Sequence, residues 1–135
     1  MLTNIVRFAA GFFGLFLLLM GIRWLVDPAG AAEGLGMTLL PGLVAGVSDG
    51  QGLSTQIGDL ASFFVVGGVF GLVGAIKRSA VLMLTPAALV LATAIFRTIA
   101  WTTHGAGFAQ QAIISEVVMG VVFLLAYWRF SRSQD

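Results

Sequence analysis

The stretch AIFRTIAWTTHG (94–105) places an arginine, a tryptophan and a histidine at the end of a long apolar run. The run extends from about Ala80 to Thr102, and about 20 predominantly apolar residues suffice for a helix to cross a bilayer. A charge at the bilayer centre costs about 2.5–3.5 kcal/mol, so we expect Arg97 to face other helices and to pair with an acid. The stretch therefore predicts a membrane helix within a bundle that has a polar site inside.

The composition of the whole chain also indicates a membrane protein. Of its 135 residues, 59% are hydrophobic and 10% are charged, and the mean hydropathy is +1.01. A soluble domain carries roughly 25% charged residues. The net charge of +1 offers no basic surface for a nucleic acid partner. Cysteine is absent, as are Walker, dinucleotide-glycine, HExxH and nucleophile-elbow motifs, so we expect no cofactor, no metal site and no enzymatic activity.

Four segments of the chain are long and apolar enough to span a bilayer. They cover about 5–26, 53–76, 80–102 and 108–128. We expect one all-α domain over 1–135, a bundle of four transmembrane helices with a long outer loop between the first two. A rival interpretation makes the first span a signal peptide cleaved at AGAA (29–32), but its apolar region is too long for that.

Two features of the outer loop carry structural expectations. Asp27-Pro28 is a favourable helix start and predicts a short helix lying in the membrane interface. The stretch MTLLPGLVAGV (37–47) is apolar but broken by Pro41, so we expect a loop or hairpin on the outer membrane surface. In the second span, small-residue spacing predicts close helix packing, within the bundle or against a second copy. The glycines concerned are Gly67, Gly68, Gly71 and Gly74.

The charges outside the spans predict the orientation of the chain. Lys77 and Arg78 lie between the second and third spans, and Arg129 and Arg132 follow the fourth. The connection between the first and second spans is acidic instead. Because basic loops stay on the cytoplasmic side, we expect both termini in the cytoplasm.

The ionisable groups inside the spans are expected to lie near one level. Counted at about 1.5 Å per residue from the basic residue at the cytoplasmic end of each span, Asp59, Arg97 and Glu116 lie roughly 27, 28 and 20 Å up. Such a layer predicts that Glu116 neutralises Arg97 with Asp59 sharing it, while Arg23 and Asp27 pair locally. The candidate ligand-binding or ion-pair residues are Arg97, Glu116, Asp59, His104, Arg23, Asp27 and Trp101.

Several of these residues also have a purely structural interpretation. The Arg97–Glu116 pair can be a salt bridge that only locks the bundle, or a binding or proton-handling site. His104 suits a hydrogen-bonding group near a loop better than a metal ligand. Trp101 follows the face of Arg97, but it is also typical of the aromatic belt at a membrane interface, as we expect of Trp24 and Trp128.

Four stretches of the sequence carry a family resemblance. They are Asp27-Pro28, GDLASFFVVGG (58–68), FRTIAWTTHGAGF (96–108) and ISEVVMG (114–120). The chain resembles the DUF4345 family of small four-helix bacterial membrane proteins, whose function is unknown. The resemblance implies a bacterial inner-membrane protein with an Arg97–Glu116 pair, and it implies no substrate. The general architecture is also similar to that of DoxX-type four-helix proteins, which is an analogy of fold alone.

Three functions agree with this pattern. The leading hypothesis is a non-enzymatic binding or accessory protein that holds a lipid-like or amphipathic molecule, or a partner protein, at the polar cluster near the outer leaflet. The first alternative is a small proton-coupled transporter that uses Glu116 as the carrier. The second is a structural subunit of a larger membrane complex. The expected partners are therefore the lipid bilayer, an amphipathic small molecule, and either a second copy of the chain or a larger complex.

Overall fold

The computed structural model describes residues 1–39 and 51–132, and in that part of the chain all regular structure is helical. The helices are α1 (Leu2–Val26), α2 (Pro28–Gly34), α3 (Gln51–Lys77), α4 (Ala80–His104) and α5 (Gln110–Ser131). Four of them, α1, α3, α4 and α5, are long and apolar enough to cross a membrane, as the sequence predicts. The loop or hairpin expected around Pro41 lies outside the described residues.

The bounds of the long helices differ slightly from the predicted spans. All four helices extend past the predicted span at one or both ends, because helical hydrogen bonding continues through the polar residues that flank it. The fourth helix begins at Gln110, two residues later than expected. The preceding Gly105 ends α4 in a left-handed conformation with a φ of 69°, which a glycine adopts without strain.

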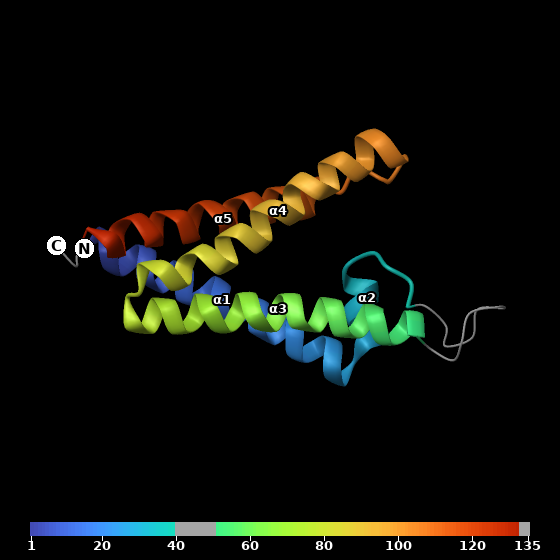
Figure 1. Ribbon diagram of the computed structural model, residues 1–135, viewed down its shortest axis with the longest axis horizontal. Coiled ribbons are helices and arrows are strands. Elements are labelled where there is room, and N and C mark those ends of the chain that lie inside the picture. Colours follow the sequence, from blue (N-terminus) through green and yellow to red (C-terminus); the bar gives the residue numbers. More distant parts are fainter. Residues whose placement is uncertain (40–50, 133–135) are drawn as a thin grey trace.

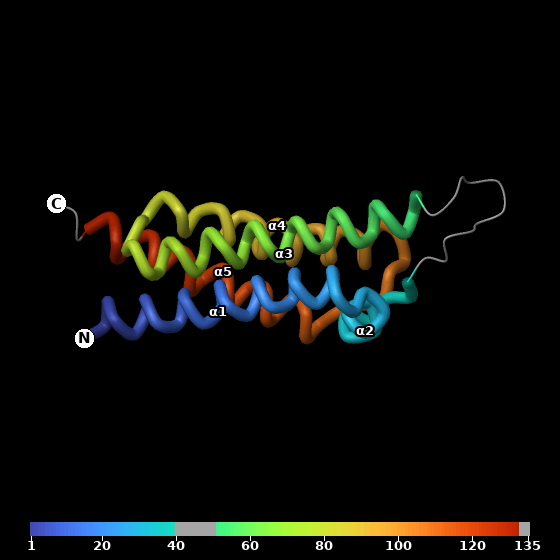
Figure 2. Tube along the Cα trace, turned by 90° about the horizontal axis from the view of Figure 1, so that it is seen from below, coloured from blue at the N-terminus to red at the C-terminus, as the bar shows by residue number. Residues whose placement is uncertain are grey.

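The four long helices form two pairs. α1 packs along α3 and α4 packs along α5, and these two contacts are the most extensive in the protein. Figure 1 shows the two pairs close together at the end that carries the N-terminus, the last turn of α5 and the α3–α4 turn. Toward the other end, where α2 and the α4–α5 connection lie, the pairs diverge. Figure 2 shows from a second direction that the N-terminus and the last turn of α5 lie at the same end.

Glycines hold α1 against α3. A Cβ on Gly14 would lie 2.5 Å from the backbone nitrogen of Leu72, and a Cβ on Gly68 would lie 2.6 Å from Cα of Leu18. The two backbones therefore touch, and a larger residue at either glycine would force the helices apart. The predicted glycines of the second span are all buried, which confirms that they pack within the bundle.

The main hydrophobic core lies at the end where the pairs meet. It joins side chains of all four long helices, and Leu17, Met83, Phe123 and Phe130 are almost completely inaccessible. Pro86 is buried inside α4, and the helix continues through it, as neighbouring helices allow in a bundle. This core fixes the two pairs at one end and leaves them free to separate at the other.

The short helix α2 confirms the helix expected after Asp27. The Asp27 carboxylate accepts a hydrogen bond from the backbone N–H of Gly30 at 3.1 Å, and Pro28 occupies the first turn. Ala31 and Ala32 of α2 pack on Trp24, which is fully buried. The expectation that Trp24 is an interfacial belt residue is therefore wrong, because α2 folds back and covers the indole ring.

The basic residues gather at the end with the termini. Arg7 donates hydrogen bonds to the carbonyl oxygens of Ala75 at 2.9 Å and Ile76 at 3.3 Å, so it caps α3 beside Lys77. Trp128, near the end of α5, is 40% exposed, and two guanidinium groups lie over its ring. They belong to Arg129 and Arg132. These basic groups, the N-terminus and the last turn of α5 thus share one end of the bundle.

Candidate functional site

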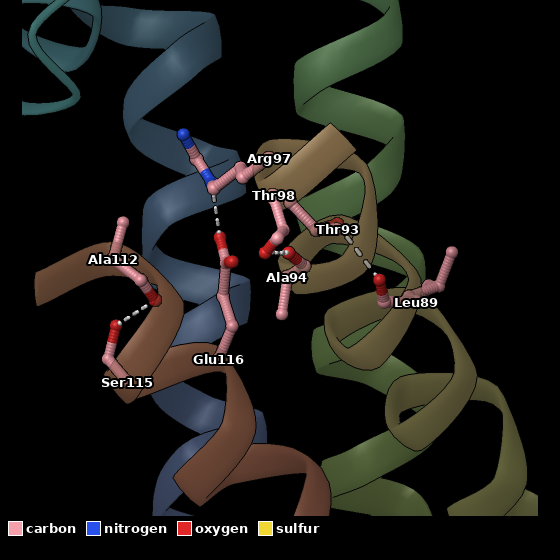
Figure 3. Close-up of polar contacts among 8 residues, drawn as sticks. All are labelled: Leu89, Thr93, Ala94, Arg97, Thr98, Ala112, Ser115 and Glu116. Atoms are coloured by element: carbon pink, nitrogen blue, oxygen red, sulfur yellow. Dashed lines mark hydrogen bonds and ion pairs between the residues drawn. The ribbon is translucent and has the colours of Figure 1, made fainter. Parts of the chain in front are cut away.

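An ion pair joins α4 to α5 in the half of the bundle where the helix pairs diverge. Arg97 lies seven residues before His104, the last residue of α4 (104 − 97), and Glu116 lies six residues after Gln110, the first of α5 (116 − 110). Both are about two turns from the connection, so antiparallel packing brings them level. Nε of Arg97 donates to Oε1 of Glu116 at 2.8 Å (Figure 3). The structure thus brings together the two residues that the sequence pairs.

The pair leaves much of its hydrogen-bonding capacity unused. A guanidinium has five N–H donors, and within residues 1–39 and 51–132 Arg97 uses only one of them. The Arg97 side chain is 33% exposed, whereas that of Glu116 is 11% exposed. Oε2 of Glu116 is buried and has no partner in the described part of the chain. Four strong donors on Arg97 are therefore available to something other than these residues.

A cavity of about 430 Å³ lies beside the ion pair. All four long helices contribute to its wall, together with the end of α2 and the residues that follow it. Most of the wall is apolar, formed by residues such as Phe16, Leu17, Met20, Leu60, Phe63 and Phe64. Among the described residues that line it, only Arg97 and Glu116 carry a charge. The cavity is thus mostly apolar, with one polar side formed by the ion pair.

Three uncharged polar side chains also line the cavity. The hydroxyl of Thr93 donates to the carbonyl of Leu89 at 2.9 Å, and that of Ser115 donates to the carbonyl of Ala112 at 2.8 Å (Figure 3). Both hydroxyl hydrogens are therefore engaged within their own helices. The third, Gln111, stands one turn before Ser115 on α5. The described residues give the Gln111 amide no hydrogen bond, so its N–H donors are available to a ligand. Arg97 is the other lining residue with available donors.

Asp59 does not share Arg97, contrary to the expectation from the sequence. Its carboxylate is exposed and forms no ion pair with any described residue. The neighbouring Leu60 lines the cavity, and successive residues on a helix point about 100° apart, so Asp59 lies on the flank of α3. Counting residues along the span predicts a depth for Asp59, and it does not predict the direction of its side chain around the helix.

The remaining candidates also lie outside the cavity. Arg23 and Asp27 form the expected local pair, with Nε and Oδ2 at 3.7 Å and both side chains about half exposed. Trp101 packs on Phe108, with ring centroids 4.8 Å apart, at the α4–α5 connection. His104 is exposed at the end of α4. Within the described residues no three acidic or histidine side chains are grouped to hold a metal ion.

Sequence reasoning missed most of the lining residues. Gln111 carried a usable signal, because it lies at i and Ser115 at i+4 on the face next to Glu116. The aromatic residues Phe16, Phe63 and Phe64 carried none, since phenylalanine in a membrane helix faces lipid as readily as a cavity. The contribution of the chain after α2 depends on tertiary packing that no local pattern indicates.

Comparisons of the chain with protein-family models, with curated proteins and with solved structures find no match. The resemblance to the DUF4345 family therefore stays a prediction, and the functional argument rests on the site itself.

Proposed function

We propose that this chain is a multi-pass protein of the bacterial inner membrane that binds an amphipathic molecule near the outer leaflet. The four long apolar helices support insertion in a membrane. The gathering of Arg7, Lys77, Arg78, Arg129 and Arg132 at the end with the termini supports a cytoplasmic location for that end. The cavity then lies in the outer half of the bilayer.

The observation that carries this proposal is that Arg97, with four N–H donors that no described residue uses, lines an apolar cavity. Ligand sites have volumes of about 300–1,000 Å³, with mostly apolar walls and a few placed polar groups. The cavity here, at about 430 Å³, has that size and that lining. A salt bridge with a purely structural role would stabilise the protein more if the arginine donated more of its N–H groups to other residues of the protein. Here Arg97 lines a space that a polar head with an apolar body fills well.

The charges around the cavity favour a head group without charge. Glu116 already neutralises Arg97, so an anionic head would place a second negative charge beside a buried carboxylate. The half of the bundle where the helix pairs diverge also carries the acidic residues Asp27, Glu33 and Asp59. Apart from Arg97, the only described cation in that half is Arg23. An uncharged carbonyl or hydroxyl oxygen accepts from Arg97 without that repulsion. Quinone-like molecules and long-chain alcohols have this chemistry.

Native mass spectrometry of the gently solubilised protein tests the proposal, with oleyl alcohol and oleyl phosphate as probes. Lysine keeps the charge of Arg97 but loses the planar set of donors, so Arg97→Lys should weaken oleyl alcohol binding by about tenfold or more. Arg23→Lys is the matched control, because that pair lies outside the cavity. We expect it to bind like the wild type. Unchanged binding by the Arg97→Lys protein would overturn the site, and tighter binding of the phosphate would overturn the uncharged head.

One observation favours a second function. The carboxylate of Glu116 is buried with one oxygen free of hydrogen bonds from the described residues, as a proton carrier in a small transporter would need. In proteoliposomes, a transporter would show pH-dependent flux that Glu116→Gln abolishes while the protein still folds. Binding of oleyl alcohol without any such flux would contradict this alternative and leave the binding function in place.

A further inference from the structure

A second hollow, a groove of about 460 Å³, lies between α1 and α5. The apolar residues that line it include Phe12 and Phe13 of α1 and Ile114 and Val118 of α5. Phe16, Gln111, Ser115 and Met119 line both this groove and the cavity. The two spaces are therefore neighbours that share a wall, with the polar side chains at the boundary.

The groove opens on the outside of the bundle. Phe12 is 65% exposed, Ile114 is 54% exposed and Val118 is 48% exposed. Large apolar side chains on the outer surface of a membrane bundle face lipid chains. Among the neighbouring pairs of long helices, α1 and α5 make the smallest contact. The α1–α5 seam is therefore the least tightly packed side of the bundle. The groove thus lies between the ion pair's cavity and the outer surface of the bundle.

We propose that the bound molecule carries a single hydrocarbon chain that lies in the α1–α5 groove, and that it exchanges directly with the outer leaflet through this seam. This inference rests on the proposed function, because the head of the same molecule occupies the cavity at Arg97. The groove has no charged lining residue among those described, and the Ser115 hydroxyl already donates within its own helix. Gln111, at the boundary with the cavity, is the one lining side chain of the groove with N–H donors that no described residue uses. A hydrocarbon chain fills the rest of this surface, whereas a water-soluble solute would leave most of its own polar groups without partners.

The arrangement of the polar pair agrees with this route. Figure 3 shows Arg97 and Glu116 reaching toward each other between α4 and α5, with α1 behind them. A head group held by Arg97 therefore has α1 and α5 within reach of its chain. The side chains of Met119 and Phe16 line both the cavity and the groove. The hydrocarbon chain of the ligand would therefore pass from one to the other along the flexible methionine and the flat phenyl ring.

Two valines on α5 supply a matched test. Val118 and Val121 are each 48% exposed, but only Val118 lines the groove. Tryptophan at position 118 fills the groove, so Val118→Trp should weaken binding of oleyl alcohol by about tenfold or more relative to Val121→Trp. Hexanol, whose chain is too short to need the groove, should bind both variants alike. Equal binding of oleyl alcohol by the two variants would overturn the route.

The same measurements separate this inference from the function it rests on. Failure of the binding function itself appears as no binding of either alcohol to the wild type, which overturns both. Binding that is lost in Arg97→Lys but indifferent to Val118→Trp overturns the groove alone. A second pair guards against misfolding of the tryptophan variants, because Phe12 lines the groove and the more exposed Phe8 does not. Phe12→Ala should weaken oleyl alcohol binding and Phe8→Ala should not.

Discussion

The Arg97–Glu116 pair predicts a specific pattern in a double-mutant cycle. The variants are Arg97→Leu, Glu116→Leu and the double substitution. Removing one partner of a buried ion pair typically costs about 3–5 kcal/mol, because the other charge stays buried alone. The side chain of Glu116 is 11% exposed and that of Arg97 is 33% exposed. Loss of Arg97 should therefore be the more costly single change.

The expected free energies follow from those exposures. We expect Arg97→Leu to lower the free energy of unfolding by about 3 kcal/mol, at the low end for a buried pair. Glu116→Leu should lower it by about 2 kcal/mol, since the remaining guanidinium has access to the cavity. Two apolar residues can replace a buried pair at little net cost, so the double variant should lose no more than about 2 kcal/mol. The coupling energy is then about 3 kcal/mol.

The assay is reversible unfolding in mixed micelles titrated with dodecyl sulfate, followed by the helical circular dichroism signal. The same cycle at Arg23 and Asp27 is the control, because that pair is exposed, with its two atoms 3.7 Å apart. There the coupling should stay below about 0.5 kcal/mol. Additive losses at Arg97 and Glu116, with a double variant about 5 kcal/mol less stable, would refute the idea that each residue is held by the other.

Two further predictions concern packing at Gly68 and Trp24, and a third concerns the Asp59 carboxylate. Gly68→Ala should lower the free energy of unfolding by about 2 kcal/mol or more, because its Cβ meets the backbone of Leu18; Gly58→Ala, with open space around it, should not lower it. Trp24→Ala should cost about 3–5 kcal/mol, because the ring is fully buried, and Trp24→Phe much less, because the indole N–H has no partner in the described residues. Asp59→Asn should leave both stability in dodecyl sulfate titration and oleyl alcohol binding unchanged, because its carboxylate is exposed and outside the cavity.

The sequence predicts the spans and the ion pair because both depend on properties that run along the chain. Apolar length is read directly, and the short α4–α5 connection fixes which residues of the two helices are level. Arg97 and Glu116 are almost equally far from that connection, so pairing follows from the antiparallel hairpin. The close approach of α1 and α3 follows in the same way from glycine spacing, since small residues permit backbone contact.

Residues whose surroundings depend on direction or on distant packing were harder to place. The expected depth of Asp59 does not fix its direction, and it lies on the flank of α3 beside the lining residue Leu60. Trp24 looks like a belt residue until α2 folds over it. The divergence of the two helix pairs is also not predicted by any local sequence pattern. Close contacts at glycines bring α1 to α3, whereas Phe13 and Phe64 pack against the core that joins the four helices, so the spacing depends on residues far apart in the sequence.

The account stands on one claim, that the Arg97 guanidinium, held by Glu116, faces a cavity that receives the head of an amphipathic molecule. Solid-state NMR of the protein in bilayers measures this directly, through the dipolar coupling between isotope-labelled Nη atoms of Arg97 and the labelled head carbon of bound oleyl alcohol. We predict a clear coupling in the wild type at saturating alcohol. The absence of that coupling, with the alcohol bound elsewhere on the protein, would contradict the account.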